Sequence, residues 1–290
     1  AKAFQLPAQQ SITPLLVPAE VLPRALAFSS AGMQGAIIAG PAIGGFVYVA
    51  GAPAVYASCT ALFLTSCAMV LGVRYEHVAR IAGAATLDTL LAGVRFVRQR
   101  EVVLGAISLD LFAVLLGGAS ALLPMFAKDV LQVGPWGLGL LRAAPAVGAL
   151  VTALALSHWP IRQRAGFVLL SSVGVYGAAM LGFALSTQLL LSMLMLAISG
   201  AADMVSVVIR QSLVQLETPD EMRGRVSAVN SVFIGASNQL GEFESGVTAA
   251  LLGPVGSVVL GGLGSMAIAA LWVRWFPALA RRDRLVETTP

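Results

Sequence analysis

Long apolar stretches follow one another along this chain, separated by short breaks that carry charges, glycine or proline. A stretch of about 20 apolar residues is long enough to cross a bilayer as a helix. Strands are excluded because backbone groups in lipid must be satisfied within their own segment or in a closed barrel. Eight complete spanning helices are expected, at residues 31–49, 54–73, 102–126, 136–156, 167–185, 189–208, 226–252 and 255–275. With part of another helix at 4–17, this predicts an all-α polytopic membrane protein.

The composition supports a membrane protein and argues against a soluble enzyme. Hydrophobic residues make up 58% of the chain and charged residues 11%, whereas a soluble domain has about 25% charged residues. His77 and His158 are isolated, and Cys59 and Cys67 lie in one apolar stretch without metal-ligand spacing. We therefore expect no catalytic residues, no metal and no cofactor. The net charge of +4 is spread over several loops, which argues against nucleic acid as a partner.

Basic residues are concentrated in every second connection between the apolar stretches. The intervening connections carry Lys128 or no basic residue. Short loops rich in Arg and Lys stay in the cytoplasm, so the sequence predicts a membrane protein with a cytoplasmic C-terminus. The basic residues of the predicted cytoplasmic loops are Arg24, Arg74, Arg80, Arg95, Arg98, Arg100, Arg162, Arg164, Arg223, Arg225, Arg281, Arg282 and Arg284.

An internal repeat relates the two ends of the chain. An offset of 201 residues aligns Pro18 with Pro219, Gly40 with Gly241 and Arg24 with Arg225. Both copies begin on the same predicted side, so the repeat is parallel, as between two similar six-helix bundles. The offset implies that about 100 residues precede this chain in a twelve-helix protein. The predicted organisation is then the rest of a first bundle (1–75), a cytoplasmic linker with an amphipathic helix (76–100), a second bundle (101–278) and a cytoplasmic tail (279–290).

Several motifs resemble the major facilitator superfamily of transporters. Gly40-Pro41-Ala42-Ile43-Gly44-Gly45 is similar to the core of the antiporter motif of its exporters, with Ala27 and Ala36 in place of two upstream glycines. The segments 218–225 and 238–246 resemble the branch that contains the bacterial enterobactin exporter. The resemblance implies a major facilitator fold, alternating access, and a seal between the bundles at Gly40, Pro41, Gly44 and Gly45. Plain tight packing of small residues is the alternative for these four positions.

Seven charged residues lie inside predicted spanning helices, where a charge costs at least about 2.5 kcal/mol and needs a partner or water. We expect Asp110 to pair with Arg210, and Arg142 to pair with Glu242 or Glu244. Asp203 and Arg210 are about 10 Å apart along one helix face, which predicts no direct contact. The predicted substrate or proton pathway is Lys2, Asp110, Asp203, Arg210, Arg142, Glu242 and Glu244.

The repeat makes Lys2 the counterpart of Asp203, so these two residues are expected to form a pair or a shared substrate site. A static ion pair that only fixes helix packing is the alternative. Either Asp110 or Asp203 is expected to carry the coupled proton. Asp220, Glu221, Arg223 and Arg225 open a predicted helix, where they are expected to form a cytoplasmic gate or simply to cap that helix.

The expected function is secondary active transport, as proton-coupled efflux of a small amphipathic molecule such as a siderophore or drug. An uptake permease of the same fold, and an inactive truncated membrane protein or scaffold, are the alternatives. The expected partners are the substrate, protons and the lipid bilayer, and the protein is expected to be a monomer.

Overall fold

The computed structural model describes residues 32, 35, 36, 39–41, 43–72, 87–117, 119–159, 161 and 163–283. The chain divides into two compact units, residues 1–83 and 84–290, and each is considered by itself. The predicted helix at 4–17 lies outside the described residues.

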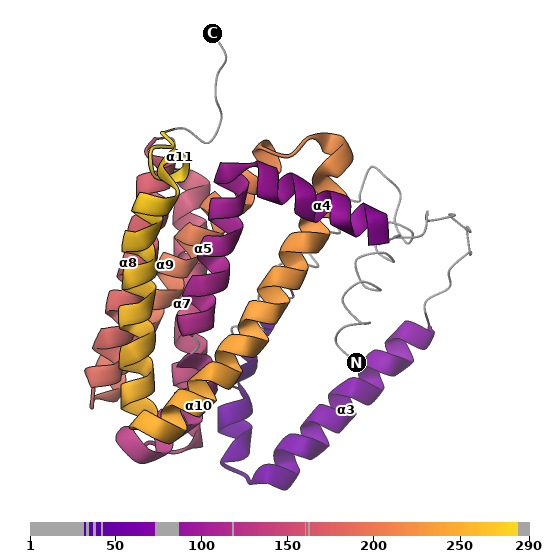
Figure 1. The fold of residues 1–290 in the computed structure, drawn as a ribbon. Helices are drawn as coiled ribbons and strands as arrows, with labels where there is room; N and C mark the ends of the chain where they lie inside the picture. Colours follow the sequence, from indigo (N-terminus) through magenta and orange to yellow (C-terminus); the bar gives the residue numbers. More distant parts are fainter. Residues whose placement is uncertain are drawn as a thin grey trace. The chain divides into compact units, whose positions relative to one another are not determined.

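The first unit contains helix α3 (Ala52–Leu71), which is drawn in violet in Figure 1. Gly51 adopts a positive φ of 98° before the helix, and Pro53 lies in its first turn, where a missing backbone N–H is tolerated. No described residue of α3 is buried, and Tyr56, Leu62 and Phe63 are at least 71% exposed. A helix with such an apolar exposed surface is suited to lipid. Residues 43–48 are also helical.

The second unit is built from long helices and short helical turns. Its helices are α4 (Leu87–Gln99), α5 (Glu101–Gly117), α6 (Leu123–Met125), α7 (Pro135–His158), α8 (Ala165–Leu185), α9 (Leu189–Leu216), α10 (Asp220–Trp275) and α11 (Pro277–Ala280), with a 3-10 turn η1 (Ala119–Leu122) and a π turn η2 (Phe126–Val130). The part of the chain that the structure describes contains no strand. Six of its helical segments are long and apolar enough to cross a membrane, in agreement with the predicted all-α membrane fold.

Three predicted helix boundaries differ from the structure. The predicted helix 102–126 corresponds to α5 together with η1, α6 and the start of η2, and the Tyr176 hydroxyl donates a hydrogen bond of 2.7 Å to the Gly117 carbonyl. Helix α9 continues beyond the apolar stretch 189–208 to Leu216, and it includes Arg210, which was expected on the same helix face as Asp203. The predicted helices 226–252 and 255–275 are the two arms of α10, which bends at Gly253, where φ is 75° and ψ is 167°.

The helices of the second unit run between two chemically different ends (Figure 1). One end carries α4, α11 and exposed arginines at 95, 98, 164, 225 and 281, and is termed the basic end. The opposite end carries the bend of α10 and is termed the Gly253 end; the charged residues there are Lys128 and Asp129. This asymmetry is the structural counterpart of the alternation of basic loops in the sequence.

Close helix contacts hold the second unit together. Helix α9 packs against α7 and α8, and α10 packs against α5 and α8. Helices α7 and α9 approach so closely that a methyl group at Gly148 would lie 1.8 Å from the Ala197 carbonyl oxygen, and one at Gly200 would lie 2.0 Å from that of Pro145. In membranes, small residues at helix interfaces allow such close packing.

Helix α4 crosses the basic end and packs against the beginning of α10 (Figure 1). Val97 is buried with Val226 and Val229, and Gly93 lies against the Arg225 carbonyl group. Arg95 and Arg98 are exposed, as expected for an amphipathic helix. Leu91 is 57% exposed, because α4 contacts its neighbours through the face that holds Gly93 and Val97.

The end of the described chain is bonded to the beginning of α8. The backbone N–H groups of Ala165 and Gly166 donate to the carbonyls of Asp283 and Arg282, at 3.1 and 2.9 Å. Asp283 Oδ1 also accepts from the Arg164 N–H, and Arg282 forms a 2.7 Å ion pair with Glu217. These contacts satisfy N–H groups that a helix start leaves without an internal partner. Residues 281–283, termed the C-terminal strap, thereby join the ends of α8, α9 and α10.

Candidate functional site

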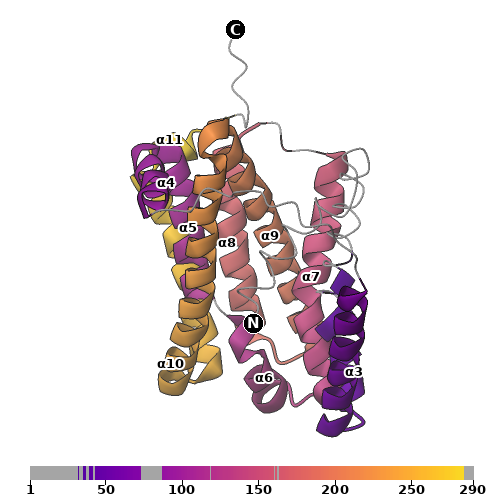
Figure 2. The same ribbon diagram turned by 90° about the vertical axis from the view of Figure 1, so that its right-hand side faces the viewer.

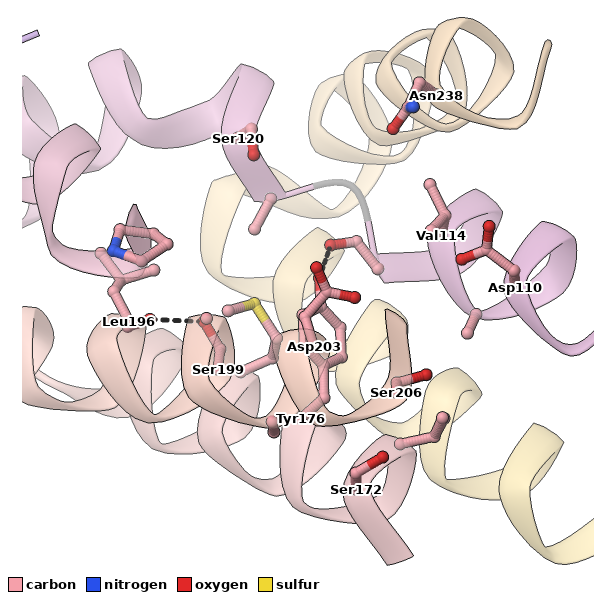
Figure 3. Close-up of a pocket in the computed structure, with 18 of the residues that line it drawn as sticks. Asp110, Val114, Ser120, Ser172, Tyr176, Leu196, Ser199, Asp203, Ser206 and Asn238 are labelled. Carbon is pink, nitrogen blue, oxygen red and sulfur yellow. Dashed lines mark hydrogen bonds between the residues drawn. The ribbon is translucent and has the colours of Figure 1, made fainter. Parts of the chain in front are cut away.

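A cavity of about 230 Å³ lies within the second unit. Helices α5, α8 and α9 supply most of its wall, and Asn238 of α10 lies at one side (Figure 3). A second cavity of about 280 Å³ lies among α5, α9 and the first arm of α10. The two cavities share the residues Asp110, Val114, Asp203, Arg210 and Asn238. Three charged groups therefore lie where the two cavities meet.

Arg210 contacts two carboxylates in this shared wall. Its Nη1 atom forms an ion pair with Asp110, and its Nη2 atom lies 4.0 Å from Asp203 Oδ1. The side chains of Asp110 and Arg210 are each 11% exposed, whereas that of Asp203 is 54% exposed. Asp110 is thus the close partner of the guanidinium group, and Asp203 keeps a carboxylate that is open to the cavity. We term Asp110, Arg210 and Asp203 the charged triad.

The helices bring the triad together for a simple geometric reason. Asp110 lies about 14 Å from the start of α5, and Arg210 about 9 Å from the end of α9; both helix ends are at the basic end. Asp203 and Arg210 were expected to share one helix face without direct contact. The structure places Arg210 Nη2 4.0 Å from Asp203 Oδ1, at the limit of an ion pair, because the long arginine side chain extends back along its helix. The two groups therefore lie nearer to each other than their spacing along the helix suggests, although no hydrogen bond joins them.

Hydroxyl groups in the cavity wall were not among the residues that the sequence predicted for the pathway. Ser199, Asp203, Ser206 and Arg210 follow each other at intervals of three or four residues on α9. This spacing places them on one helix face, so the pattern was present in the sequence. Serine is common in apolar helices, however, and only the charged members of the stripe were selected as candidates.

Three of the hydroxyl groups donate their protons to backbone carbonyls. Ser172 donates to Leu169, Ser199 to Leu196 and Tyr176 to Gly117, each at 2.7 Å. Figure 3 shows the bonds of Ser199 and Tyr176 as dashed lines. A hydroxyl group has one proton and two lone pairs, so these three oxygens remain available to the cavity as acceptors.

Arg142 does not meet its expected partners. Arg142 is exposed on α7, Glu242 is exposed on α10 and Glu244 is partly buried there. Helix α7 packs against α9, whereas α10 packs against α5 and α8, so the two helices lie on different sides of the unit (Figure 2). Among the described residues neither glutamate forms an ion pair with Arg142. This predicted pairing was wrong.

The remaining predicted residues lie outside the described part or outside the cavities. Lys2 is outside the described residues. Gly40, Pro41, Gly44 and Gly45 belong to the first unit, and no described atom lies within 4 Å of a methyl group placed on Gly40 or Gly44. Their role as a seal stays a prediction.

The predicted cytoplasmic gate lies at the start of α10, which Asp220 and Glu221 begin. Arg223 and Arg225 are exposed in the next turn, and Arg225 donates a hydrogen bond of 3.4 Å to the Met222 sulfur. Gating by these residues stays a prediction. In the described part of the chain, no three His, Cys, Asp or Glu side chains are placed to hold a metal ion.

Comparisons with known proteins identify the family of this chain. The family described as transmembrane secretion effector matches residues 1–284. Enterobactin exporters EntS from Escherichia coli O1:K1 / APEC, O45:K1 (strain S88 / ExPEC) and O81 (strain ED1a) are each 30% identical to this chain over 186 residues. The alignment covers 64% of this chain but 44% of each relative. The chain belongs to the transmembrane secretion effector family of the major facilitator superfamily of transporters.

Proposed function

We propose that this protein exports a small amphipathic molecule across the inner membrane of a bacterium in exchange for protons. The observation that carries the proposal is the charged triad, in which one guanidinium group faces two carboxylates in a cavity wall. Family membership supports transport, and the names of the relatives support export. The basic end would face the cytoplasm, since arginine-rich ends remain on that side.

The triad offers two arrangements that differ by one proton. When Asp110 is ionised, its carboxylate holds Arg210 Nη1. A proton on Asp110 neutralises this carboxylate and weakens its attraction for Arg210. An ion pair between Arg210 and Asp203, whose Oδ1 already lies 4.0 Å from Nη2, is then the more favourable arrangement. A ligand or proton shifts such an equilibrium only by binding the two states differently. Movement of Arg210 from Asp110 to Asp203 would give the two states different affinities for the proton.

The coupling is tested by transport into inside-out vesicles. An inside-acid pH gradient should drive uptake of a small amphipathic test substrate, either enterobactin, which the names of the relatives suggest, or an amphipathic amine. A protonophore should abolish this uptake. Asp110→Asn should lose gradient-driven uptake while keeping exchange of labelled for unlabelled substrate without a gradient. Asp129→Asn, at an exposed carboxylate of the Gly253 end, is the matched control.

Two results would count against the proposal. Full gradient-driven uptake by Asp110→Asn would remove the triad as the site of coupling. Uptake by right-side-out vesicles under an inward proton gradient would instead identify the protein as an uptake permease. Retained exchange in the variant separates loss of coupling from loss of folding.

A further inference from the structure

The wall of the cavity in the second unit is rich in acceptors and carries an excess negative charge. Its charged residues are those of the triad, so two carboxylates face one guanidinium group and the formal charge of the described wall is −1. The hydroxyl oxygens of Ser172, Ser199 and Tyr176 add acceptors, because their protons are bonded to the backbone. Such a wall is matched by a ligand that donates hydrogen bonds and carries one positive charge.

Asp203 is the member of the triad that is available to a ligand. Arg210 Nη1 is paired with Asp110, and both of these side chains are nearly buried. The Asp203 side chain is 54% exposed and stands in both cavities. Tyr176 lines the same cavity, and Figure 3 shows it beside Asp203 in one wall. A carboxylate beside an aromatic ring favours a bound cation.

Apolar side chains line the same cavity between and beyond the polar groups. Val173, Met180 and Leu196 line it together with Pro145. A ligand that fills this space therefore has an apolar body and a charged end. We propose that the site binds a protonated amine on an apolar scaffold, with its ammonium group on Asp203 and its body against Met180 and Leu196. This inference rests on the proposed function only in taking the cavity as the substrate site.

Binding can be measured without transport, on the purified protein in nanodiscs. Three compounds with one scaffold separate charge from shape: 4-phenylbutylammonium, 4-phenylbutanol and 4-phenylbutyrate. Isothermal titration calorimetry should show that the ammonium compound binds about tenfold to a hundredfold more tightly than the alcohol, the range expected for a charge-assisted hydrogen bond. The carboxylate compound should show no binding.

Variants assign the preference to Asp203. Asp203→Asn should reduce the affinity for the ammonium compound to that for the alcohol, and the affinity for the alcohol should stay unchanged, which shows that the cavity is intact. Ser199→Ala removes one acceptor and should weaken ammonium binding by a smaller factor. Asp129→Asn, which removes an exposed carboxylate outside the cavities, should bind like the unchanged protein.

Several outcomes would overturn the inference. Tighter binding of 4-phenylbutyrate or 2,3-dihydroxybenzoate than of the ammonium compound would assign the cavity to anions. Equal ammonium binding by Asp203→Asn would remove its anchor. In each case gradient-driven export in vesicles would be unaffected, so failure of this inference is distinguishable from failure of the proposed function.

Discussion

Arg210 is the residue on which the polar chemistry of the second unit depends. Its guanidinium group is nearly buried and faces two carboxylates. Removing one member of a buried ion pair leaves an uncompensated charge, which costs about 3–5 kcal/mol, whereas replacing both members together costs far less. The contribution of the pair to stability is therefore best measured with both partners varied.

We expect Arg210→Gln to destabilise the protein by about 3–5 kcal/mol, because it leaves the nearly buried Asp110 carboxylate without its partner. Asp110→Asn should cost less, because Arg210 can then turn to Asp203. The double variant should be more stable than the sum of the two effects predicts, because neither charge is then left alone. Denaturation in mixed micelles, followed by tryptophan fluorescence, measures the free energy of unfolding. Additive effects of the two substitutions would show that the ion pair does not contribute as the structure indicates.

The charged members of the site could be predicted from the sequence, and their neighbours only in part. Asp110 and Arg210 stood out because charges are costly in apolar stretches, and their similar depth from the predicted cytoplasmic side suggested that they meet. The expected contact of Arg142 with the glutamates of α10 was wrong, because depth along a helix does not tell which helices are adjacent. Tyr176 was missed because nothing in the local sequence links it to Gly117.

At the scale of the elements, glycines set the distances between the helices. Helices α7 and α9 meet at Gly148 and Gly200, and each glycine lies directly against a backbone carbonyl of the other helix. Pro145, whose carbonyl lies against Gly200, also lines the cavity. The position of the cavity wall therefore depends on this contact.

Gly148→Ala should destabilise the protein strongly, since its methyl group would lie 1.8 Å from the Ala197 carbonyl oxygen and the helices would have to separate. The matched control is Gly174→Ala in α8, where no described atom lies within 4 Å of the added methyl group. This substitution should be neutral or should stabilise the protein by up to about 1 kcal/mol, since alanine favours the helix more than glycine does. Thermal unfolding of the detergent-solubilised proteins makes the comparison. Equal melting temperatures would contradict the close packing of α7 and α9.

The existence of the helices was more predictable than their ends. The predicted helices 136–156 and 167–185 correspond to α7 and α8 within a few residues, because apolar length alone identifies a spanning segment. Within the predicted helix 102–126, however, the chain passes from the α-helix α5 to the 3-10 turn η1 and the π turn η2. Hydropathy measures how apolar a segment is and does not contain such changes of helix type.

At the scale of the whole molecule, the difference between the basic end and the Gly253 end predicts orientation. In a variant without the native cysteines, made by Cys59→Ala and Cys67→Ala, a single cysteine can be placed at either end. Thr187→Cys at the Gly253 end should react with a membrane-impermeant maleimide in intact cells, and Gln163→Cys at the basic end should react only after permeabilisation. The reverse pattern would invert the predicted topology and, with it, the direction of transport.

The C-terminal strap has a consequence for how the protein is made. The acceptor that the Arg164 N–H uses is Asp283, 119 residues further along the chain. A ribosome adds residues from the N-terminus at about 5–20 per second, so α8 is synthesised several seconds before its cap exists. The first turn of α8 must wait, hydrated or held by the insertion machinery, until Asp283 has been synthesised. The start of this helix is therefore completed only after α9, α10 and α11 have followed it, rather than as the helix itself is made.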